Sequence, residues 1–115
     1  MQEKMRTRSK KFALAILRFA RGLRQDDESR VIGRQLLRSA TSMAANYRAA
    51  GRGRSRAEFL AKLGLVVEEA DETVFWLELV EEAQIVAPEL LSDLHKEAEE
   101  LLSIFSASLR TARRS

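Results

Sequence analysis

The sequence predicts a single all-α domain, an antiparallel up-down-up-down four-helix bundle. Three observations support this prediction. Leu, Ala, Glu and Arg are the commonest of the 115 residues, and all four favour helices. Pro occurs once and Gly five times, so long helices can form without interruption. Apolar residues recur at steps of three and four in four segments, and the short connections between them make consecutive helices antiparallel.

The first two predicted helices span residues 9–23 and 29–50. Ser29 is the expected N-cap of the second helix, because its hydroxyl can accept from an unpaired backbone N–H. Residues 39–46 are nearly all small, so a neighbouring helix can approach closely there. Gly51-Arg52-Gly53 predicts the end of the helix, since glycine tolerates the left-handed conformation of a C-terminal cap.

The third and fourth predicted helices span residues 55–86 and 88–112. Ser55 and Glu58 have the spacing of a capping box, in which side chain and backbone bond reciprocally at a helix start. Pro88 suits the first turn of the last helix, where its missing N–H has no partner to lose.

The third helix carries apolar residues around most of its circumference, whereas a helix of a monomeric bundle keeps one polar face. This pattern predicts self-association through Trp76, Phe75 and Leu79, with Trp76 as the anchor. The alternative is a core that reaches around a tilted helix.

The sequence offers no catalytic site, no metal site and no cofactor motif, so we expect a protein that is not an enzyme. Cysteine is absent, and His95 is the only histidine and lacks the Glu-x-x-His spacing of di-iron bundles. We expect His95 to be solvated. The acidic run from Glu68 to Glu72 is interpreted as a solvated face or as the partner of nearby arginines.

No signal peptide is recognisable, and no stretch approaches the roughly 18 apolar residues of a membrane span. We therefore expect a cytoplasmic protein that has no membrane partner.

Charge is distributed unevenly along the chain. Residues 1–56 hold 15 Lys/Arg and 4 Asp/Glu, a net charge of +11, and residues 57–115 hold 5 and 13, a net charge of −8. The first eight residues are predicted to form a basic N-terminal tail. Either the basic half binds phosphate, or it packs against the acidic half of the same chain.

Two groups of arginines are candidates for contacts with RNA or DNA phosphates. A stripe at steps of four along the second helix contains Arg30, Arg34 and Arg38. A second group at the turn into the third helix contains Arg48, Arg52, Arg54 and Arg56. The alternative pairs part of these groups across the bundle, with Arg34, Arg38 and Arg48 opposite Glu68, Glu69 and Glu72.

Three segments carry a recognisable motif. They read Ser39-Ala40-Thr41-Ser42-Met43-Ala44-Ala45-Asn46-Tyr47-Arg48-Ala49-Ala50, then Gly53-Arg54-Ser55-Arg56-Ala57-Glu58-Phe59-Leu60, then Glu69-Ala70-Asp71-Glu72-Thr73. This pattern resembles the bacterial four helix bundle protein family, also called the 23S ribosomal RNA intervening-sequence protein family. The resemblance covers about residues 11–109, and it implies an antiparallel four-helix bundle.

The resemblance also implies partners. The related accessory variability determinant of diversity-generating retroelements is a homopentamer with a basic surface, and it binds nucleic acid and a reverse transcriptase. We therefore expect a homo-oligomer, with a pentamer as the model, that acts as an accessory module for RNA or DNA without base specificity. The alternative is a protein-interaction scaffold whose charges neutralise each other internally.

The chain departs from the commoner family motif, Asn-Ile-Ala-Glu-Gly, at residues 46–50. It reads Asn46-Tyr47-Arg48-Ala49-Ala50, so the acidic residue and the glycine are missing and an arginine is gained. A role tied to that glutamate does not carry over. Asn46 is interpreted as a structural, hydrogen-bonding residue.

Overall fold

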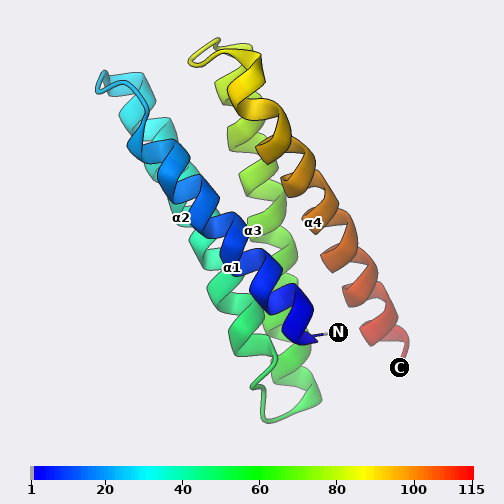
Figure 1. Ribbon diagram of the computed structural model, residues 1–115. Coiled ribbons are helices and arrows are strands. Elements are labelled where there is room, and N and C mark those ends of the chain that lie inside the picture. The colour runs from blue at the N-terminus through cyan, green and yellow to red at the C-terminus, as the bar shows by residue number, and fades with distance from the viewer. Residues whose placement is uncertain (1) are drawn as a thin grey trace.

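The computed structural model describes residues 2–115, which form four α-helices joined by short loops (Figure 1). The helices are α1 (Gln2–Arg21), α2 (Asp27–Ala50), α3 (Arg56–Glu82) and α4 (Pro88–Arg114). Consecutive helices run antiparallel and no strand occurs among the described residues, so the predicted four-helix bundle is confirmed. The molecule measures 45 × 20 × 19 Å. Its length follows from α3 and α4, since 27 residues at about 1.5 Å each give a helix of about 40 Å.

Helix α1 begins seven residues earlier than predicted, so the expected basic N-terminal tail is wrong for residues 2–8. Met5 is buried and extends the apolar stripe that continues through Ser9, Phe12 and Ile16 at steps of four and three. Arg8 also has a structural role, because its guanidinium contacts Glu97 and Glu100 on α4. Burial of Met5 and this ion pair hold the first turns of α1 against the bundle.

Among the helix starts, one predicted cap is wrong, one is confirmed, and the predicted opening proline is confirmed. Asp26, not Ser29, is the N-cap of α2, and its carboxylate accepts from the Ser29 backbone N–H at 2.9 Å. A carboxylate is doubly suited here, because it both accepts the bond and faces the positive end of the helix dipole. Ser55 caps α3 as predicted and accepts from the Glu58 N–H at 3.1 Å. Pro88 opens α4 as predicted.

The helix ends differ more from the sequence prediction. Gly51 follows α2 in a right-handed conformation with φ −65°, so the expected left-handed cap is wrong. Gly53 matters for another reason, since a Cβ there would lie 3.2 Å from the Ala50 carbonyl oxygen and 3.3 Å from the Phe59 nitrogen. The left-handed residue of the described chain is instead Gln84, with φ 55°, and α3 ends before it at Glu82.

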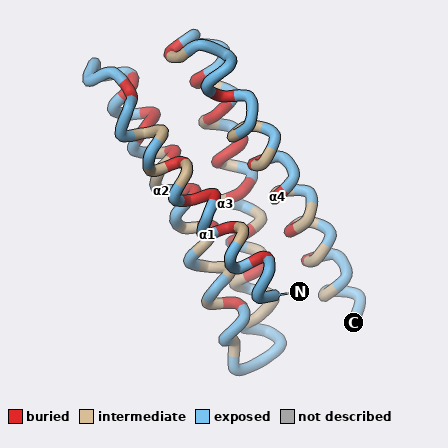
Figure 2. Tube along the Cα trace, in the orientation of Figure 1, coloured by how far each residue is buried: buried red, intermediate tan, exposed pale blue. Residues whose placement is uncertain are grey.

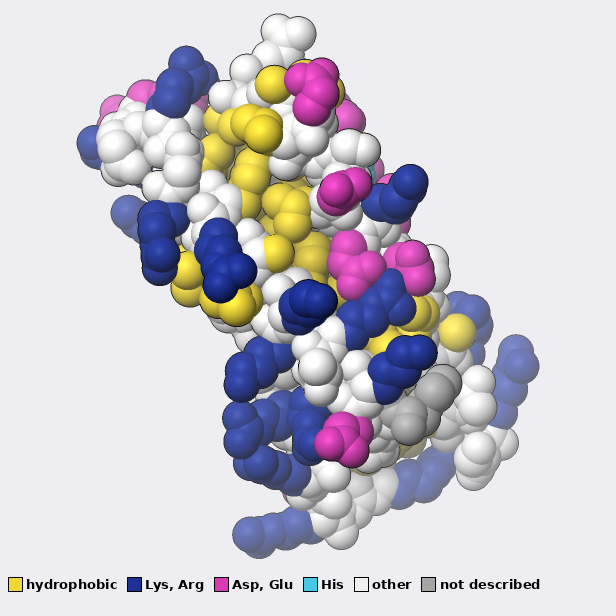
Figure 3. Space-filling model, viewed as in Figure 1, with side chains coloured by type: hydrophobic (Ala, Val, Ile, Leu, Met, Phe, Trp, Pro, Cys, Tyr) yellow, Lys and Arg dark blue, Asp and Glu magenta, His cyan; other side chains and the backbone are white. Residues whose placement is uncertain are grey.

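The hydrophobic core lies along the inward sides of all four helices (Figure 2). Phe105 is fully buried, and the Tyr47 ring packs beside it with the ring centroids 4.9 Å apart. Helices α2 and α3 form the most extensively packed pair, whereas α1 and α4 touch only lightly. Figure 3 shows a band of hydrophobic side chains along this open seam between α1 and α4.

The three predicted interface residues lie differently on α3. Phe75 is half exposed, at 51%, and its ring meets the Trp76 ring edge-on. Trp76 and Leu79 are only partly exposed and pack against the core, and the Trp76 indole N–H donates to Glu72 at 3.1 Å. A core that reaches around the helix therefore accounts for part of the apolar surplus. Phe75 is the residue left for self-association, which stays a prediction.

None of the helices in residues 2–115 is long and apolar enough to cross a membrane. The same residues hold no group of three or more His, Cys, Asp or Glu side chains that could bind a metal ion. His95 was expected to be solvated, but its side chain is mostly covered at 18% exposure, with Nε2 3.9 Å from a Glu99 carboxylate oxygen.

Candidate nucleic-acid interface

The small-residue segment of α2 packs against α3, and polar groups meet there inside the core. Ser39 and Thr73 are both fully buried, and their hydroxyl oxygens lie 2.8 Å apart. The Thr73 hydroxyl is also 2.8 Å from the Glu69 carbonyl oxygen, and Ser39 donates to the Leu36 carbonyl at 3.2 Å. Both buried hydroxyls therefore have partners, as burial of polar groups requires.

Polar contacts continue outward from this pair toward solvent. Ser42 donates to the Glu69 carboxylate at 2.9 Å. Asn46 donates to the Ser42 carbonyl at 2.9 Å and lies 3.1 Å from the Ser42 hydroxyl. The structural, hydrogen-bonding role predicted for Asn46 matches this position, because it orients the serine that contacts α3.

Arg38 closes the outer edge of the same α2–α3 network. Its guanidinium donates to Glu69 at 3.3 Å and to Glu72. The Arg38 guanidinium, helped by the Trp76 indole, holds the pKa of Glu72 below its usual range, and the same contact raises the pKa of Arg38. Arg38 is therefore engaged with α3, and a phosphate would have to compete with two carboxylates for its guanidinium.

The predicted arginine stripe of α2 splits between two sides of the helix. Of the three cross-bundle partners considered for the acidic run, only Arg38 pairs with α3. Arg34 lines a hollow beside α1, and Arg48 lies near α1 at the other end of α2. Glu68 is exposed. The split arises because α2 has α1 on one side and α3 on the other, and a step of four drifts around the helix.

Arg56 is also engaged within the bundle. Its guanidinium donates to the Ala112 carbonyl oxygen at 2.6 Å, one of the carbonyls in the last turn of α4. Such carbonyls lack a helical N–H partner, so a cation there stabilises the helix end. Arg56 links the start of α3 to the end of α4.

One group of cations gathers where α1 begins and α2 ends, because the two helices are antiparallel. The group lines two adjoining hollows, and we name it the Arg48 cluster: Arg6, Lys10, Arg48, Arg52 and Arg54. Every member is exposed, and none forms an ion pair within residues 2–115. Figure 3 shows Lys and Arg side chains along this α1–α2 flank, while Asp and Glu appear mainly on the α4 side of the view.

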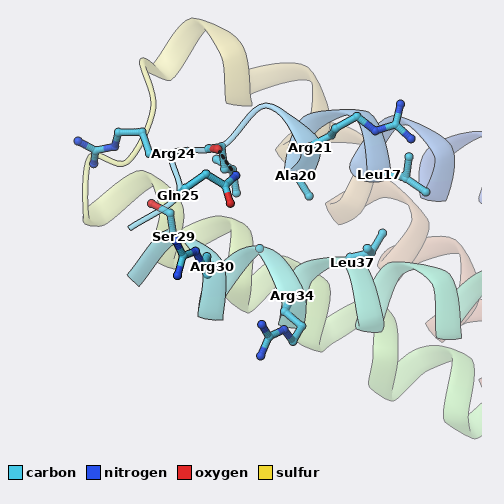
Figure 4. A pocket seen from close by; sticks show the side chains of 11 residues that line it. Leu17, Ala20, Arg21, Arg24, Gln25, Ser29, Arg30, Arg34 and Leu37 are labelled. Atoms are coloured by element: carbon cyan, nitrogen blue, oxygen red, sulfur yellow. Dashed lines mark hydrogen bonds between the residues drawn. The ribbon is translucent and has the colours of Figure 1, made fainter. Parts of the chain in front are cut away.

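A second group lies at the other end of the α1–α2 pair, and we name it the Arg34 cluster: Arg21, Arg24, Arg30 and Arg34. It surrounds a hollow with Leu17 and Leu37 on its two sides (Figure 4). The guanidinium groups extend away from the hollow in different directions and do not converge. Arg24 lies 3.4 Å from Asp26 and Arg30 lies 3.9 Å from Asp27, contacts that leave both side chains mostly exposed.

The sequence predicts Arg6 and Lys10 only as part of a basic tail that could contact phosphate, and it gives no local signal that links Arg21 to Arg34. The available signal was the pairing of antiparallel neighbours, which brings residues of α1 and α2 whose numbers sum to about 55 to the same level. Arg21 then falls beside Arg34, as the shared hollow shows.

Comparison with known families tests the family resemblance that the motif suggested. The family model described as 23S rRNA-intervening sequence protein matches residues 2–107. The chain belongs to this family. A crystal structure of a protein with unknown function from the S23 ribosomal protein family of Bacteroides thetaiotaomicron is similar, with a TM-score of 0.86 and 29% sequence identity over 95% of this chain and 97% of that one. No curated protein matches the chain.

The family motif coincides with the α2–α3 network. The segments that carried the resemblance, residues 39–50 and 69–73, contain the buried Ser39–Thr73 pair and the contacts of Glu69. In this member of the 23S rRNA-intervening sequence protein family, these parts of the motif therefore hold two helices together. The exposed cations of α1 lie outside the motif.

We predict that replacing two arginines one turn apart on α2 changes the stability of the protein by different amounts. Arg38→Ala removes the contacts with Glu69 and Glu72 and should lower the free energy of unfolding by about 1 kcal/mol, the upper range for an exposed ion pair. Arg34→Ala removes no ion pair and should stay within about 0.5 kcal/mol of the parent. Urea unfolding followed by circular dichroism measures both.

Acidification is the control for this comparison. The folded-state pKa of Glu72 is lowered, so its stabilising charge is fully present above the ordinary carboxyl value of about 4.3 and is lost as pH falls through the lowered value. The difference between Arg38→Ala and the parent should therefore shrink in acid. Equal stability of the two variants at neutral pH would contradict the assignment.

Proposed function

We propose that this protein is a non-enzymatic, self-associating accessory module that binds RNA or DNA through phosphate contacts without base specificity. The observation that carries the proposal is the Arg48 cluster, five exposed cations without an ion-pair partner in the described chain. Arginine binds phosphate bidentately, and contacts to phosphate carry no sequence information.

The distribution of charge supports a free basic face over internal neutralisation. The basic half of the sequence forms α1 and α2, and the acidic half forms α3 and α4. Only Arg8 and Arg38 of the basic half form ion pairs with the acidic half among residues 2–115. Because the other cations of α1 and α2 form no ion pair with α3 or α4 in this part of the chain, the α1–α2 surface presents a positive potential to a polyanion.

The absence of catalysis in the proposal is supported by the titratable groups. Active sites shift pKa values by burial and charge, but each shift here has a structural cause. The pKa of Asp26 is lowered by its capping bond to Ser29, and that of Glu72 by Arg38. The pKa of Tyr47 is raised by burial beside the core.

Removal of three of the five cations of the Arg48 cluster should weaken nucleic-acid binding without unfolding the protein. For Arg48→Ala, Arg52→Ala and Arg54→Ala combined, we expect affinity for a structured RNA to fall at least about tenfold, and the salt slope to fall by about three, one unit for each lost phosphate contact. Fluorescence anisotropy across a salt series, on nuclease-treated protein, measures both quantities. The melting temperature should change little because these side chains have no ion pair.

The matched control removes three cations from α4. Lys96→Ala, Arg110→Ala and Arg113→Ala combined change the net charge equally but leave the α1–α2 face intact. This variant should retain most of the affinity. An equal loss in both variants would mean that net charge alone governs binding, and no binding by the parent at low salt would overturn the proposal.

The self-associating part of the proposal rests on the outer face of the α2–α3 pair. Phe75 is half exposed, and Val31 on α2 is 55% exposed. The contacts of Ser39 with Thr73 and Ser42 with Glu69 set the register of the two helices, and this register brings Val31 to the level of the partly exposed Leu79. These residues form an apolar patch that a second copy of the chain would bury.

Phe75 is a better probe of this patch than Trp76. A charge at Trp76 would also disturb Glu72 and the core, whereas Phe75→Glu changes an exposed side chain. We expect Phe75→Glu to lower the native mass in light scattering to that of a smaller assembly. Leu90→Glu, on α4 at 65% exposure, is the control and should leave the mass unchanged. An unchanged mass for Phe75→Glu would contradict this interface.

A further inference from the structure

We infer that the basic face takes double-stranded nucleic acid in preference to single strands, with the duplex lying along the α1–α2 pair and contacting it at both ends. This inference rests on the proposed function, because it treats the α1–α2 face as the phosphate-binding surface. It adds the form of the ligand and its placement, and it follows from three features of the face.

The first feature is the spacing of the two clusters. Arg34 and Arg48 are 14 residues apart on one straight helix, which separates them by about 21 Å. Arg30 on α2 and Arg52 just beyond its end are about 33 Å apart if the helical rise is continued. One turn of a B-form DNA duplex is about 34–36 Å. The same strand of such a duplex therefore returns to the protein surface at about the separation of these two cations.

The second feature is a middle with few charges. Between the clusters the α1–α2 face carries Leu14, Leu17, Leu37, Thr41 and Ala45, and the exposed Arg18 lies one turn from Leu14. Leu14 is 45% exposed, so the middle is partly apolar. A single strand that followed the face would place several phosphates over this stretch with few compensating cations. A rigid duplex need not, because its backbone turns away from the surface between two contacts.

The third feature is the lack of an exposed aromatic side chain on this face. Proteins that hold single strands stack bases on aromatic rings. Phe12 and Phe105 are buried, and Tyr47 packs against Phe105. The other aromatic residues lie elsewhere or pack against the core: Phe19 and Phe59 contact the core, and Phe75 and Trp76 lie on α3.

The directions of the arginines exclude a tight site for one small anion. In the Arg34 cluster, the Arg21 and Arg24 guanidinium groups point apart, and that of Arg34 points away from α1 (Figure 4). A small phosphate could meet only one of them at a time. Such divergent cations suit a rigid polyanion that offers a separate phosphate to each.

Binding of duplexes of two lengths and of one single strand tests the inference. We would compare duplexes of about 8 and about 16 base pairs, roughly 27 and 54 Å at 3.4 Å per pair, with a single strand of about 16 nucleotides, by anisotropy across a salt series. Both RNA and DNA duplexes would be used. The longer duplex should bind at least about tenfold more tightly than the single strand. The shorter should show a smaller salt slope, since it is shorter than the separation of Arg30 and Arg52 and cannot contact both at once.

A variant separates this geometry from a simple effect of length. Arg30→Ala with Arg34→Ala removes cations at one end only, and should reduce the salt slope for the longer duplex toward that of the shorter one. It should change binding of the shorter duplex much less, because the Arg48 cluster still holds it. The control with three cations removed from α4 should keep the full difference between the two lengths.

The outcomes separate the two proposals. Equal or tighter binding of the single strand, or a salt slope that is the same for both duplex lengths, would overturn the duplex inference and leave phosphate binding intact. An Arg30/Arg34 variant with an unchanged slope would also overturn it. No binding of any of these nucleic acids at low salt would overturn the proposed function itself.

Discussion

The contact between α2 and α3 determines how the rest of the surface is used. Small side chains on α2 let α3 approach, and the buried Ser39–Thr73 pair sets the register of the two helices. Arg38 completes this contact at its edge by holding Glu69 and Glu72. Each hydroxyl also contacts a carbonyl of its own helix, so sliding of one helix along the other would not orphan them, but it would break their mutual bond and the contacts of Ser42 and Arg38 with α3. The orientation of α2 about its own axis is thereby defined.

That orientation directs the other arginines of α2 toward α1 and solvent. Helix α1 is itself rich in Lys and Arg, so the antiparallel α1–α2 pair is basic at both of its ends. Most acidic residues of the chain belong to the other helix pair, and among residues 2–115 two arginines account for the ion pairs between the halves. A four-helix bundle can thus keep two charged surfaces apart, with the core rather than salt bridges supplying most of the cohesion.

Apolar spacing predicted the four helices and their order because a bundle is built from that periodicity. The ends were harder to predict, since Asp26 and Ser29 are both plausible caps and the left-handed Gln84 has no sequence signature. The local density of charge in the sequence was enough to predict that Arg48, Arg52 and Arg54 lie together. It could not predict that Arg38 forms an ion pair and Arg34 does not, because this depends on which helix packs against each side of α2. The engagement of Arg56 depends on where α4 ends, a contact across 56 residues of sequence.

Chemical labelling of arginine, mapped residue by residue with mass spectrometry, tests the central claim most directly. The claim is that the arginines divide into structural ones and free ones. In the protein alone, Arg34, Arg48 and Arg52 should react quickly, and Arg8 and Arg38 slowly, because carboxylates hold their guanidinium groups. Addition of a duplex should protect the first set and leave the second unchanged. Fast labelling of Arg38, or protection confined to the arginines of α4, would contradict the division.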